Sequence, residues 1–380
     1  MKRFICLTFV LLLFQSLTAQ VIYEPFNSAK LGRNCEIKIQ LPRGYDSEEK
    51  IEYPLIVVLD GDYLFEPVIG NVDYQSYWDD MPGCIVVGIN QDQTRTDDFS
   101  VTEENYFPSM DGAKFFEFVG QELVPYINDT YHASDFRIIV GHDLSANFLN
   151  FYLFKELPLF RAYVSLSPDL SPMMVERLGE KMPAVQTDTF YYLATGEEDA
   201  SALKEGIEAC NAVLSAVENP KFHYRFDNFE ATNHYSLVGL ALPKAISQIF
   251  NLYKPITKKE YQEDILAYEG SPYDYLVKKY ESIESFYGFK KKLIENDIRA
   301  IAAASNKKDD IESLENLAKW AKKEYPDSMI SSYYMGMWHE KAGDLKRALH
   351  SYQSGLLLQS SQFIDKDMLL EKMYEIKGEN

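Results

Sequence analysis

The sequence predicts an α/β fold with a mostly parallel central sheet, followed by an all-helical region. Short apolar runs alternate with helical stretches from residue 21 to about 255, which is the pattern of βαβ units. The runs 55–59 and 138–140 lack polar alternation, so both of their faces should be covered, as in central parallel strands. After Pro255 no convincing strand follows, and Lys, Glu, Tyr and Leu recur at helical spacing.

Strands of the first domain are expected wherever an apolar run is bounded by polar or turn residues. In chain order they are 35–41, 53–60, 84–89, 136–140, 162–166, 189–194 and 222–226. Helices are expected between them, among others at 113–127, 146–154 and 202–217. The expected domains are therefore an α/β domain at 21–255 and a helical domain at 260–380.

Residues 1–19 have the features of a signal peptide. Lys2 and Arg3 form a positive start, an apolar core follows at 4–14, and the small-residue cleavage site leaves Gln20 as the mature N-terminus. The apolar core is too short to span a bilayer as a helix. We therefore expect an exported protein, periplasmic or secreted, with no membrane span after cleavage.

The charge balance argues against a nucleic-acid partner. Lys and Arg total 38 against 58 Asp and Glu, a net charge of -20, whereas nucleic-acid binders cluster basic residues. After signal cleavage three cysteines remain, Cys35, Cys84 and Cys210, so at most one disulfide bridge is expected. No spacing resembles a zinc site, and neither a metal nor a cofactor is expected.

The most informative segment is 141–146, which reads Gly-His-Asp-Leu-Ser-Ala. It follows the expected strand at 136–140 and begins the expected helix at 146–154. A sharp turn between a strand and a helix is the setting of a nucleophile elbow, in which the central residue projects toward substrate. Here that central residue is Asp143, a carboxylate in the place of a serine.

Further segments extend this similarity along the chain. They are Tyr-Pro-Leu-Ile-Val-Val-Leu-Asp-Gly at 53–61, Val-Val-Gly-Ile-Asn at 86–90, Thr-Arg-Thr-Asp-Asp at 94–98, Asp-Gly-Ala at 111–113, Glu-Leu-Val-Pro-Tyr-Ile at 122–127 and Ser-Leu-Ser-Pro at 165–168. In this order they resemble the putative-esterase family of the α/β-hydrolase fold, which includes enterochelin-type siderophore esterases. The resemblance implies an α/β-hydrolase sandwich and a small ester or siderophore-like ligand.

The family's elbow reads Gly-His-Ser-x-Gly-Gly, so this chain departs from it at Asp143, Ser145 and Ala146. The resemblance places the catalytic histidine at His234, in the segment Asn-His-Tyr-Ser at 233–236. The order of nucleophile, acid and histidine is the usual one for this fold.

The resemblance places the acid in the loop after the strand at 189–194. Glu198 is the favoured candidate and Asp199 the second. It also places the oxyanion donors at the backbone N–H of Leu144 and at one N–H of the loop Gly61-Asp62.

Three functions remain open. A serine esterase needs a hydroxyl that a histidine deprotonates; Asp143 has none, and Ser145 lies in the first helical turn and points elsewhere. The favoured hypothesis is a catalytically degenerate esterase that acts by binding, with Asp143 ion-paired to His234. The alternative is a hydrolase in which Asp143 attacks substrate covalently and His234 serves as base.

The third hypothesis is an interaction protein that works through its helical repeats. Gly336, Gly343, Ala348, Tyr352 and Gly355 stand at offsets 0, 7, 12, 16 and 19, the positions of the small and aromatic packing residues of a tetratricopeptide repeat. A protein partner would then bind through 260–380.

Overall fold

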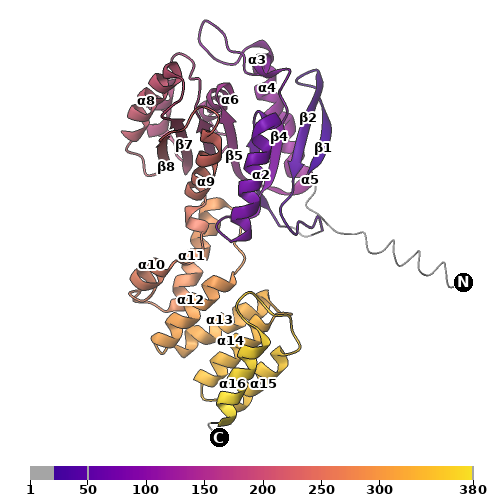
Figure 1. Cartoon of the computed structure of the whole chain (residues 1–380), viewed down its shortest axis with the longest axis vertical. Coiled ribbons are helices and arrows are strands. Elements are labelled where there is room, and N and C mark those ends of the chain that lie inside the picture. Colours follow the sequence, from indigo (N-terminus) through magenta and orange to yellow (C-terminus); the bar gives the residue numbers. More distant parts are fainter. Residues whose placement is uncertain (1–20, 49–50, 379–380) are drawn as a thin grey trace, which may run out of the picture. The chain divides into compact units, whose positions relative to one another are not determined.

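The computed structural model describes residues 21–48 and 51–378, so the signal peptide expected at 1–19 lies outside the described residues. The chain divides between Asn251 and Leu252 into two compact units, whose elements Figure 1 labels. Each unit has a hydrophobic core of its own. The expected division lay a few residues later, at 255–260. Within the described part of the chain, no helix combines the length and apolar character needed to cross a membrane.

The first unit is built on one eight-stranded sheet of order β1-β2-β4-β3-β5-β6-β7-β8. The strands are β1 Ile22–Ser28, β2 Arg33–Gln40, β3 Tyr53–Val58, β4 Ile85–Ile89, β5 Ala133–His142, β6 Ala162–Leu166, β7 Thr189–Gly196 and β8 Phe222–Phe229. All neighbouring pairs from β4 to β8 are parallel, whereas β2 is antiparallel to both β1 and β4. This confirms the mostly parallel central sheet.

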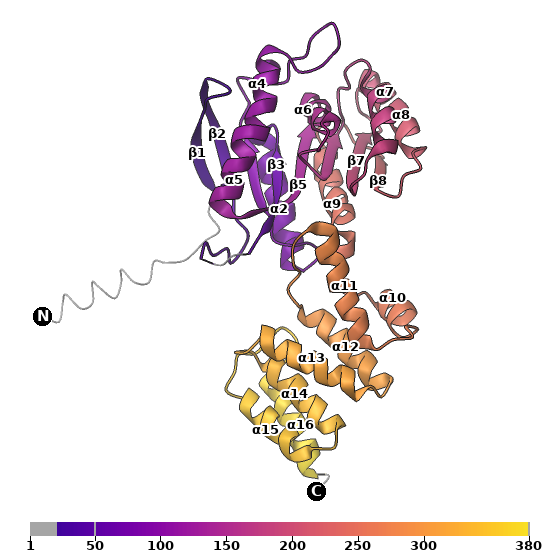
Figure 2. The same cartoon turned by 180° about the vertical axis from the view of Figure 1, so that it is seen from behind.

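Helices cover both faces of this sheet, as the unbroken apolar strands require. On one face the side chains of α4 Met110–Phe118, α5 Val124–Tyr131, α7 Met174–Lys181 and α8 Ser201–Ser215 join a single core with the strands. On the other face α2 Gly61–Tyr77 and α9 Leu237–Ile249 contact each other. Figures 1 and 2 show these two groups from opposite sides.

Strand β1 was missed by the sequence analysis. Its residues alternate between half-buried and exposed, and it contains Pro25, so it has no continuous apolar run. It lies at the edge of the sheet and pairs with β2 along its whole length. Edge strands tolerate proline because one row of their backbone groups needs no partner.

The single helix expected at 113–127 is interrupted by a π-helical turn. This turn, η1 Val119–Leu123, separates α4 from α5. Pro125 is the second residue after it and has no N–H with which to continue an α-helical ladder. The expected helix after the elbow is likewise divided into α6 Leu144–Phe148 and the 3₁₀-helix η2 Leu149–Phe154.

The second unit is all-helical in its described residues, as expected. Its helices are α10 Lys258–Glu260, α11 Pro272–Tyr287, α12 Glu295–Lys307, α13 Ile311–Glu324, α14 Met329–Lys341, α15 Leu345–Gly355 and α16 Lys366–Gly378, with a π-helical turn η5 Tyr261–Ile265. In the hairpin of α14 and α15, a Cβ added at Gly336 would lie 2.3 Å from the ring of Tyr352. Gly343 forms the turn between the helices with a φ of 79°. Only a small residue at 336 permits this close approach.

The cysteines Cys35, Cys84 and Cys210 are all free and buried. No disulfide therefore forms among the cysteines that the structure describes. Burial raises the pKa of the Cys35 and Cys210 thiols to about 12, so both remain protonated thiols at neutral pH, and thiols are poor nucleophiles.

Candidate active site

The elbow at Asp143 has the strained backbone of a nucleophile position. Asp143 joins the end of β5 to the start of α6 with φ 60° and ψ -119°, a conformation that is rare for any residue other than glycine. A Cβ added at Gly141 would lie 2.6 Å from the carbonyl carbon of Ser145. The glycine two residues before the centre is therefore required for the tight turn, as in the serine enzymes of this fold.

Ser145 stabilises the elbow from inside and is not a nucleophile. Its side chain is fully buried. The hydroxyl accepts a hydrogen bond of 2.8 Å from the backbone N–H of His142 and donates one of 2.9 Å to the His142 carbonyl. Both hydrogen-bonding capacities of the hydroxyl are thus used within the turn, which explains how serine replaces the glycine of the family's motif.

The carboxylate of Asp143 is paired with Arg95. The Arg95 Nη1 lies 3.2 Å from Oδ2 of Asp143. The same guanidinium binds Asp60 through two bonds of 2.7 and 3.1 Å and donates to the carbonyl of His142 at 3.2 Å. Within the described residues no hydrogen bond or ion pair joins Asp143 to His234, so the ion pair expected between these two residues is not formed.

Arg95 is held in place because its main partner is buried. The Asp60 side chain is only 1% exposed, whereas those of Arg95 and Asp143 are each 26% exposed. Burial by itself would lower the pKa of Arg95, but the hydrogen bonds and charge of Asp60 outweigh it and raise that pKa above its ordinary value. The guanidinium is therefore a fixed positive charge beside the elbow.

His234 is oriented by a carboxylate and a hydroxyl. It lies between β8 and α9, and its Nδ1 is 3.0 Å from Oδ1 of Asp199 and 2.9 Å from the hydroxyl of Ser167. The Ser167 hydroxyl also forms a very short hydrogen bond to Oδ2 of Asp199. Nδ1 is thereby directed at the Asp199 carboxylate, which is how a catalytic histidine is held by its acid in this fold.

Asp199, and not Glu198, is the carboxylate that contacts His234. Asp199 is buried and its pKa is lowered: burial would raise it, but hydrogen bonds from Ser167, the backbone of Ala200 and His234 prevail. Glu198 is exposed, and its backbone N–H bonds to Thr232. The loop turns the carboxylate of Asp199, and not that of the favoured Glu198, toward His234.

His142 supports the loop of His234. Burial lowers its pKa, and the neighbouring His234 lowers it further, so the ring is neutral at pH 7. Its Nε2 is 3.0 Å from the carbonyl oxygen of His234 and its Nδ1 is 3.1 Å from the hydroxyl of Tyr63. Because a carbonyl only accepts, the single proton of the neutral ring is assigned to Nε2. His142 is therefore a positioning residue.

The two expected oxyanion donors lie at the starts of helices that follow neighbouring strands. Leu144 begins α6 after β5, and Gly61 begins α2 after β3; these strands pair in parallel. The first N–H groups of a helix have no intrahelical acceptor, so both helices present donors at the same edge of the sheet. The Asp62 carboxylate turns away and accepts from the backbone N–H groups of Gln91 and Asp92 at 2.5 and 2.9 Å.

The sequence analysis missed three residues of this site: Asp60, Arg95 and Ser167. Each belongs to a segment that was recognised without being given a role. Asp60 follows β3 and Ser167 follows β6, and the carboxyl ends of parallel strands are where such folds gather functional groups. That rule was the available signal. No group of three or more potential metal ligands occurs among the described residues.

An eight-stranded, mostly parallel sheet, a strained elbow after β5 and an acid–histidine pair after β7 and β8 define an α/β-hydrolase-fold protein. Residues 28–237 match the family described as "Putative esterase". The chain belongs to this esterase family. No curated protein matches the sequence.

Solved structures agree with this assignment. An uncharacterised protein from Capnocytophaga ochracea is 33% identical with a TM-score of 0.77, and the match covers 94% of this chain and 100% of that one. An IroE-like serine hydrolase from Shewanella oneidensis is 19% identical with a TM-score of 0.61, covering 79% of this chain and 98% of that one. At this lower identity the likeness concerns the fold alone.

Proposed function

We propose that this protein is a catalytically degenerate esterase that binds a small ester-containing ligand without hydrolysing it. The observation that carries the proposal is the ion pair between Arg95 and Asp143. The residue at the nucleophile position has no hydroxyl, and its carboxylate is held by a guanidinium that it shares with the buried Asp60. His234 keeps its acid, Asp199, but has no hydroxyl proton to remove.

A negative charge at position 143 also opposes acyl transfer electrostatically. Esterases stabilise the negative oxygen of the tetrahedral intermediate with donors beside the nucleophile. In this chain a carboxylate directly precedes Leu144, whose N–H is one of those donors. Like charges at short range raise the energy of the intermediate, so the remaining site favours a neutral, unreacted ester.

Covalent catalysis by Asp143 is the rival mechanism. In it, the Asp143 carboxylate attacks the carbonyl carbon of the ester, displaces the alcohol and forms a mixed anhydride, which a water activated by His234 then hydrolyses. Pairing with Arg95 at 3.2 Å withdraws electron density from the carboxylate and so weakens it as a nucleophile. The geometry therefore supports binding over catalysis.

The first experiment measures hydrolysis of 4-nitrophenyl acetate by the full-length protein. The wild type should show no turnover above buffer. Asp143→Ser restores a hydroxyl next to His234 and should raise the rate at least about a hundredfold over that background, the range of a general-base contribution. The matched control is the double variant Asp143→Ser/His234→Ala, which should lose the gain.

The proposal fails if the wild-type protein turns over the ester and Asp143→Ala abolishes that turnover. In that case the Asp143 carboxylate displaces 4-nitrophenolate and forms a mixed anhydride with the acetyl group, and mass spectrometry of the elbow peptide after a rapid acid quench would detect that acetylated carboxylate. Binding without hydrolysis is tested separately with ethyl butyrate by ligand-observed NMR. We expect saturation transfer to the ester while its concentration stays constant.

Export is part of the proposal and rests on residues 1–19, with their basic start, apolar core and small-residue cleavage site. We place the mature protein, starting at Gln20, in the periplasm or outside the cell. Expression of the full chain in a bacterial host, followed by fractionation and N-terminal sequencing, tests this. A cytoplasmic protein that retains Met1 would contradict it.

A second candidate function is partner binding through the helical unit. The close packing of Gly336 against Tyr352 supports a tetratricopeptide-like hairpin at α14 and α15. Such repeats bind partners along a surface formed by successive helices. Capture of a partner by the full chain, and its loss on truncation after residue 259, would support this role; unchanged capture would count against it.

A further inference from the structure

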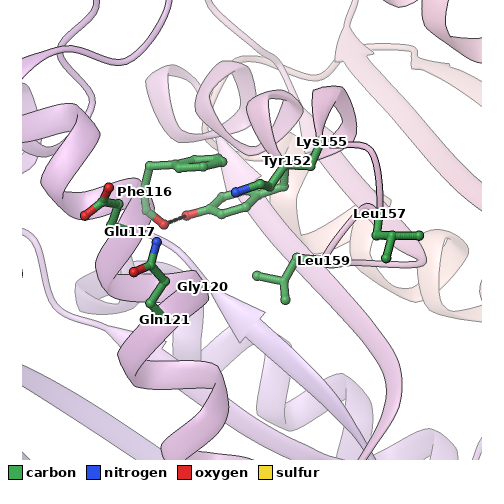
Figure 3. A pocket seen from close by; sticks show the side chains of 8 residues that line it. All are labelled: Phe116, Glu117, Gly120, Gln121, Tyr152, Lys155, Leu157 and Leu159. Atoms are coloured by element: carbon green, nitrogen blue, oxygen red, sulfur yellow. Dashed lines mark hydrogen bonds between the residues drawn. The ribbon is translucent and has the colours of Figure 1, made fainter.

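A pocket lies on the face of the sheet that α4 and α5 cover, and it is separate from the residues around Asp143. It is formed by α4 and the π-turn η1 on one side, and by η2 and the following loop on the other (Figure 3). Its lining residues are Phe116, Glu117, Gly120, Gln121, Tyr152, Lys155, Leu157 and Leu159. None of them takes part in the elbow or in the acid–histidine pair.

The floor of the pocket is aromatic and firmly built. The rings of Phe116 and Tyr152 stack with centroids 4.4 Å apart and planes inclined by 18°. The Tyr152 hydroxyl donates to the carbonyl of Phe116 at 3.3 Å (Figure 3). This bond joins η2 to the end of α4, just before the π-turn, and π-turns of this kind are frequent at functional sites.

The pocket has room for one ring. Its volume is about 220 Å³, and an apolar cavity of about 150 Å³ is already large enough to hold benzene. Leu157 is 85% exposed and, together with Leu159, forms the wall opposite the α4 side (Figure 3). Contact of this exposed leucine with an apolar ligand would remove apolar surface from water, and that burial favours binding.

The charges at the rim favour an anionic group. Glu117 is neutralised by Lys30 at 2.8 Å. The Lys155 ammonium lies 5.3 Å from the ring centroid of Phe116 and, within the part of the chain that the structure describes, forms no ion pair or side-chain hydrogen bond. The net charge of the chain is -20, yet this lysine has no carboxylate partner among the described residues. Its positive charge at the pocket rim therefore favours an anionic group on the ligand.

We propose that this pocket binds small aromatic monocarboxylates, with the ring against Phe116 and Leu159 and the carboxylate at Lys155. A single ring fills the volume, and the stacked aromatic floor favours a ring over an alkyl chain. The carboxylate supplies the missing counter-charge. The exposed amide of Gln121 is available to donate a hydrogen bond to the same group.

The test uses ¹⁹F NMR titrations of 4-fluorobenzoate and, as its uncharged counterpart, 4-fluorobenzamide. Wild-type protein should bind the acid about threefold more tightly than the amide, the factor expected of a partly exposed ion pair. Lys155→Gln should abolish this preference. Lys346→Gln, which removes an exposed charge from α15, is the matched control and should leave it unchanged.

Three further variants localise the ligand. Leu157→Asp should weaken binding of the acid more than that of the amide, whereas Leu157→Asn, of the same size, should affect both equally. Gly120→Leu places a side chain toward Leu159, which would lie 3.6 Å from an added Cβ, and should reduce binding of both probes at least tenfold. Circular dichroism establishes that each variant is folded.

Equal affinity for the acid and the amide would overturn the proposal, as would acid binding that survives both Lys155→Gln and Gly120→Leu. The outcome is independent of the proposed function at the elbow. Asp143→Ser leaves this pocket intact and should bind 4-fluorobenzoate as the wild type does. Loss of binding in that variant alone would assign the ring to the elbow and not to this pocket.

Discussion

The guanidinium of Arg95 lies 3.2 Å from the carboxylate of Asp143, at the position where an esterase of this fold carries its nucleophile. One cation thereby serves two carboxylates, because Arg95 also binds the buried Asp60. The arrangement differs from the expected pairing of Asp143 with His234. Arginine is always charged and binds carboxylates with two parallel donors, whereas Nδ1 of His234 is already directed at Asp199.

Removal of Arg95 should destabilise the α/β unit. In Arg95→Gln the Asp60 carboxylate, 1% exposed, loses its counter-charge. We expect the free energy of unfolding to fall by about 2–4 kcal/mol, below the full cost of breaking a buried pair because Arg95 is partly exposed. Urea unfolding measures this. Arg43→Gln, which breaks an ion pair whose side chains are 58% and 48% exposed, should lower it far less, because solvent screens exposed pairs; equal losses would contradict the role of Asp60.

Asp199 should make stability depend on pH in the acid range. Its pKa in the folded protein is below its ordinary value, so its contribution is fully present above the unfolded pKa of about 3.9 and is lost as the pH falls through the folded pKa. Asp199→Asn should therefore flatten the dependence of the unfolding free energy on pH below about pH 5.

The control for this prediction is Glu198→Gln. Glu198 is exposed, and we expect the change in unfolding free energy to stay within about 0.5 kcal/mol. Urea unfolding at several pH values compares the two variants with the wild type. A profile altered by Glu198→Gln and unaffected by Asp199→Asn would reverse the assignment of the acid.

Ser145 should matter for stability and not for chemistry. In Ser145→Ala the buried N–H of His142 loses the acceptor at 2.8 Å, which should cost about 1–3 kcal/mol. Ser215→Ala, at an exposed position of α8, should stay within about 0.5 kcal/mol. The double variant Asp143→Ser/Ser145→Ala should retain the esterase turnover gained by Asp143→Ser. Loss of that turnover at a temperature where the double variant is folded would show that Ser145 takes part in catalysis.

Two glycine-to-alanine changes should act in opposite directions. Gly336→Ala forces a Cβ to within 2.3 Å of the Tyr352 ring and should destabilise the helical unit by about 1–3 kcal/mol. Gly206 lies in α8 with nothing within 4 Å of an added Cβ, so Gly206→Ala should stabilise the α/β unit by about 0.5–1 kcal/mol. Calorimetric melting temperatures of both variants would show shifts of opposite sign; a neutral Gly336→Ala would contradict the close packing of α14 and α15.

Much of the fold was predictable because its signals are local. The buried strands β3 to β7 each contain a short apolar run, and the elbow is a short motif between a strand and a helix. Strand β1 was not predictable in this way, since half of its residues face solvent and its place is set by pairing with β2. The π-turn between α4 and α5 was also missed, because it changes the helical register without changing the apolar pattern.

By itself the sequence determined the α/β class, the all-helical end, the elbow and the carboxylate at position 143. These depend on neighbouring residues and on periodicity, which a chain carries without folding. Only the tertiary structure decided that Arg95 pairs with Asp143, that Asp199 holds His234 and that Ser167 joins them. Those contacts join residues that are 48, 35 and 67 positions apart, so they depend on how the loops meet at the carboxyl edge of the sheet.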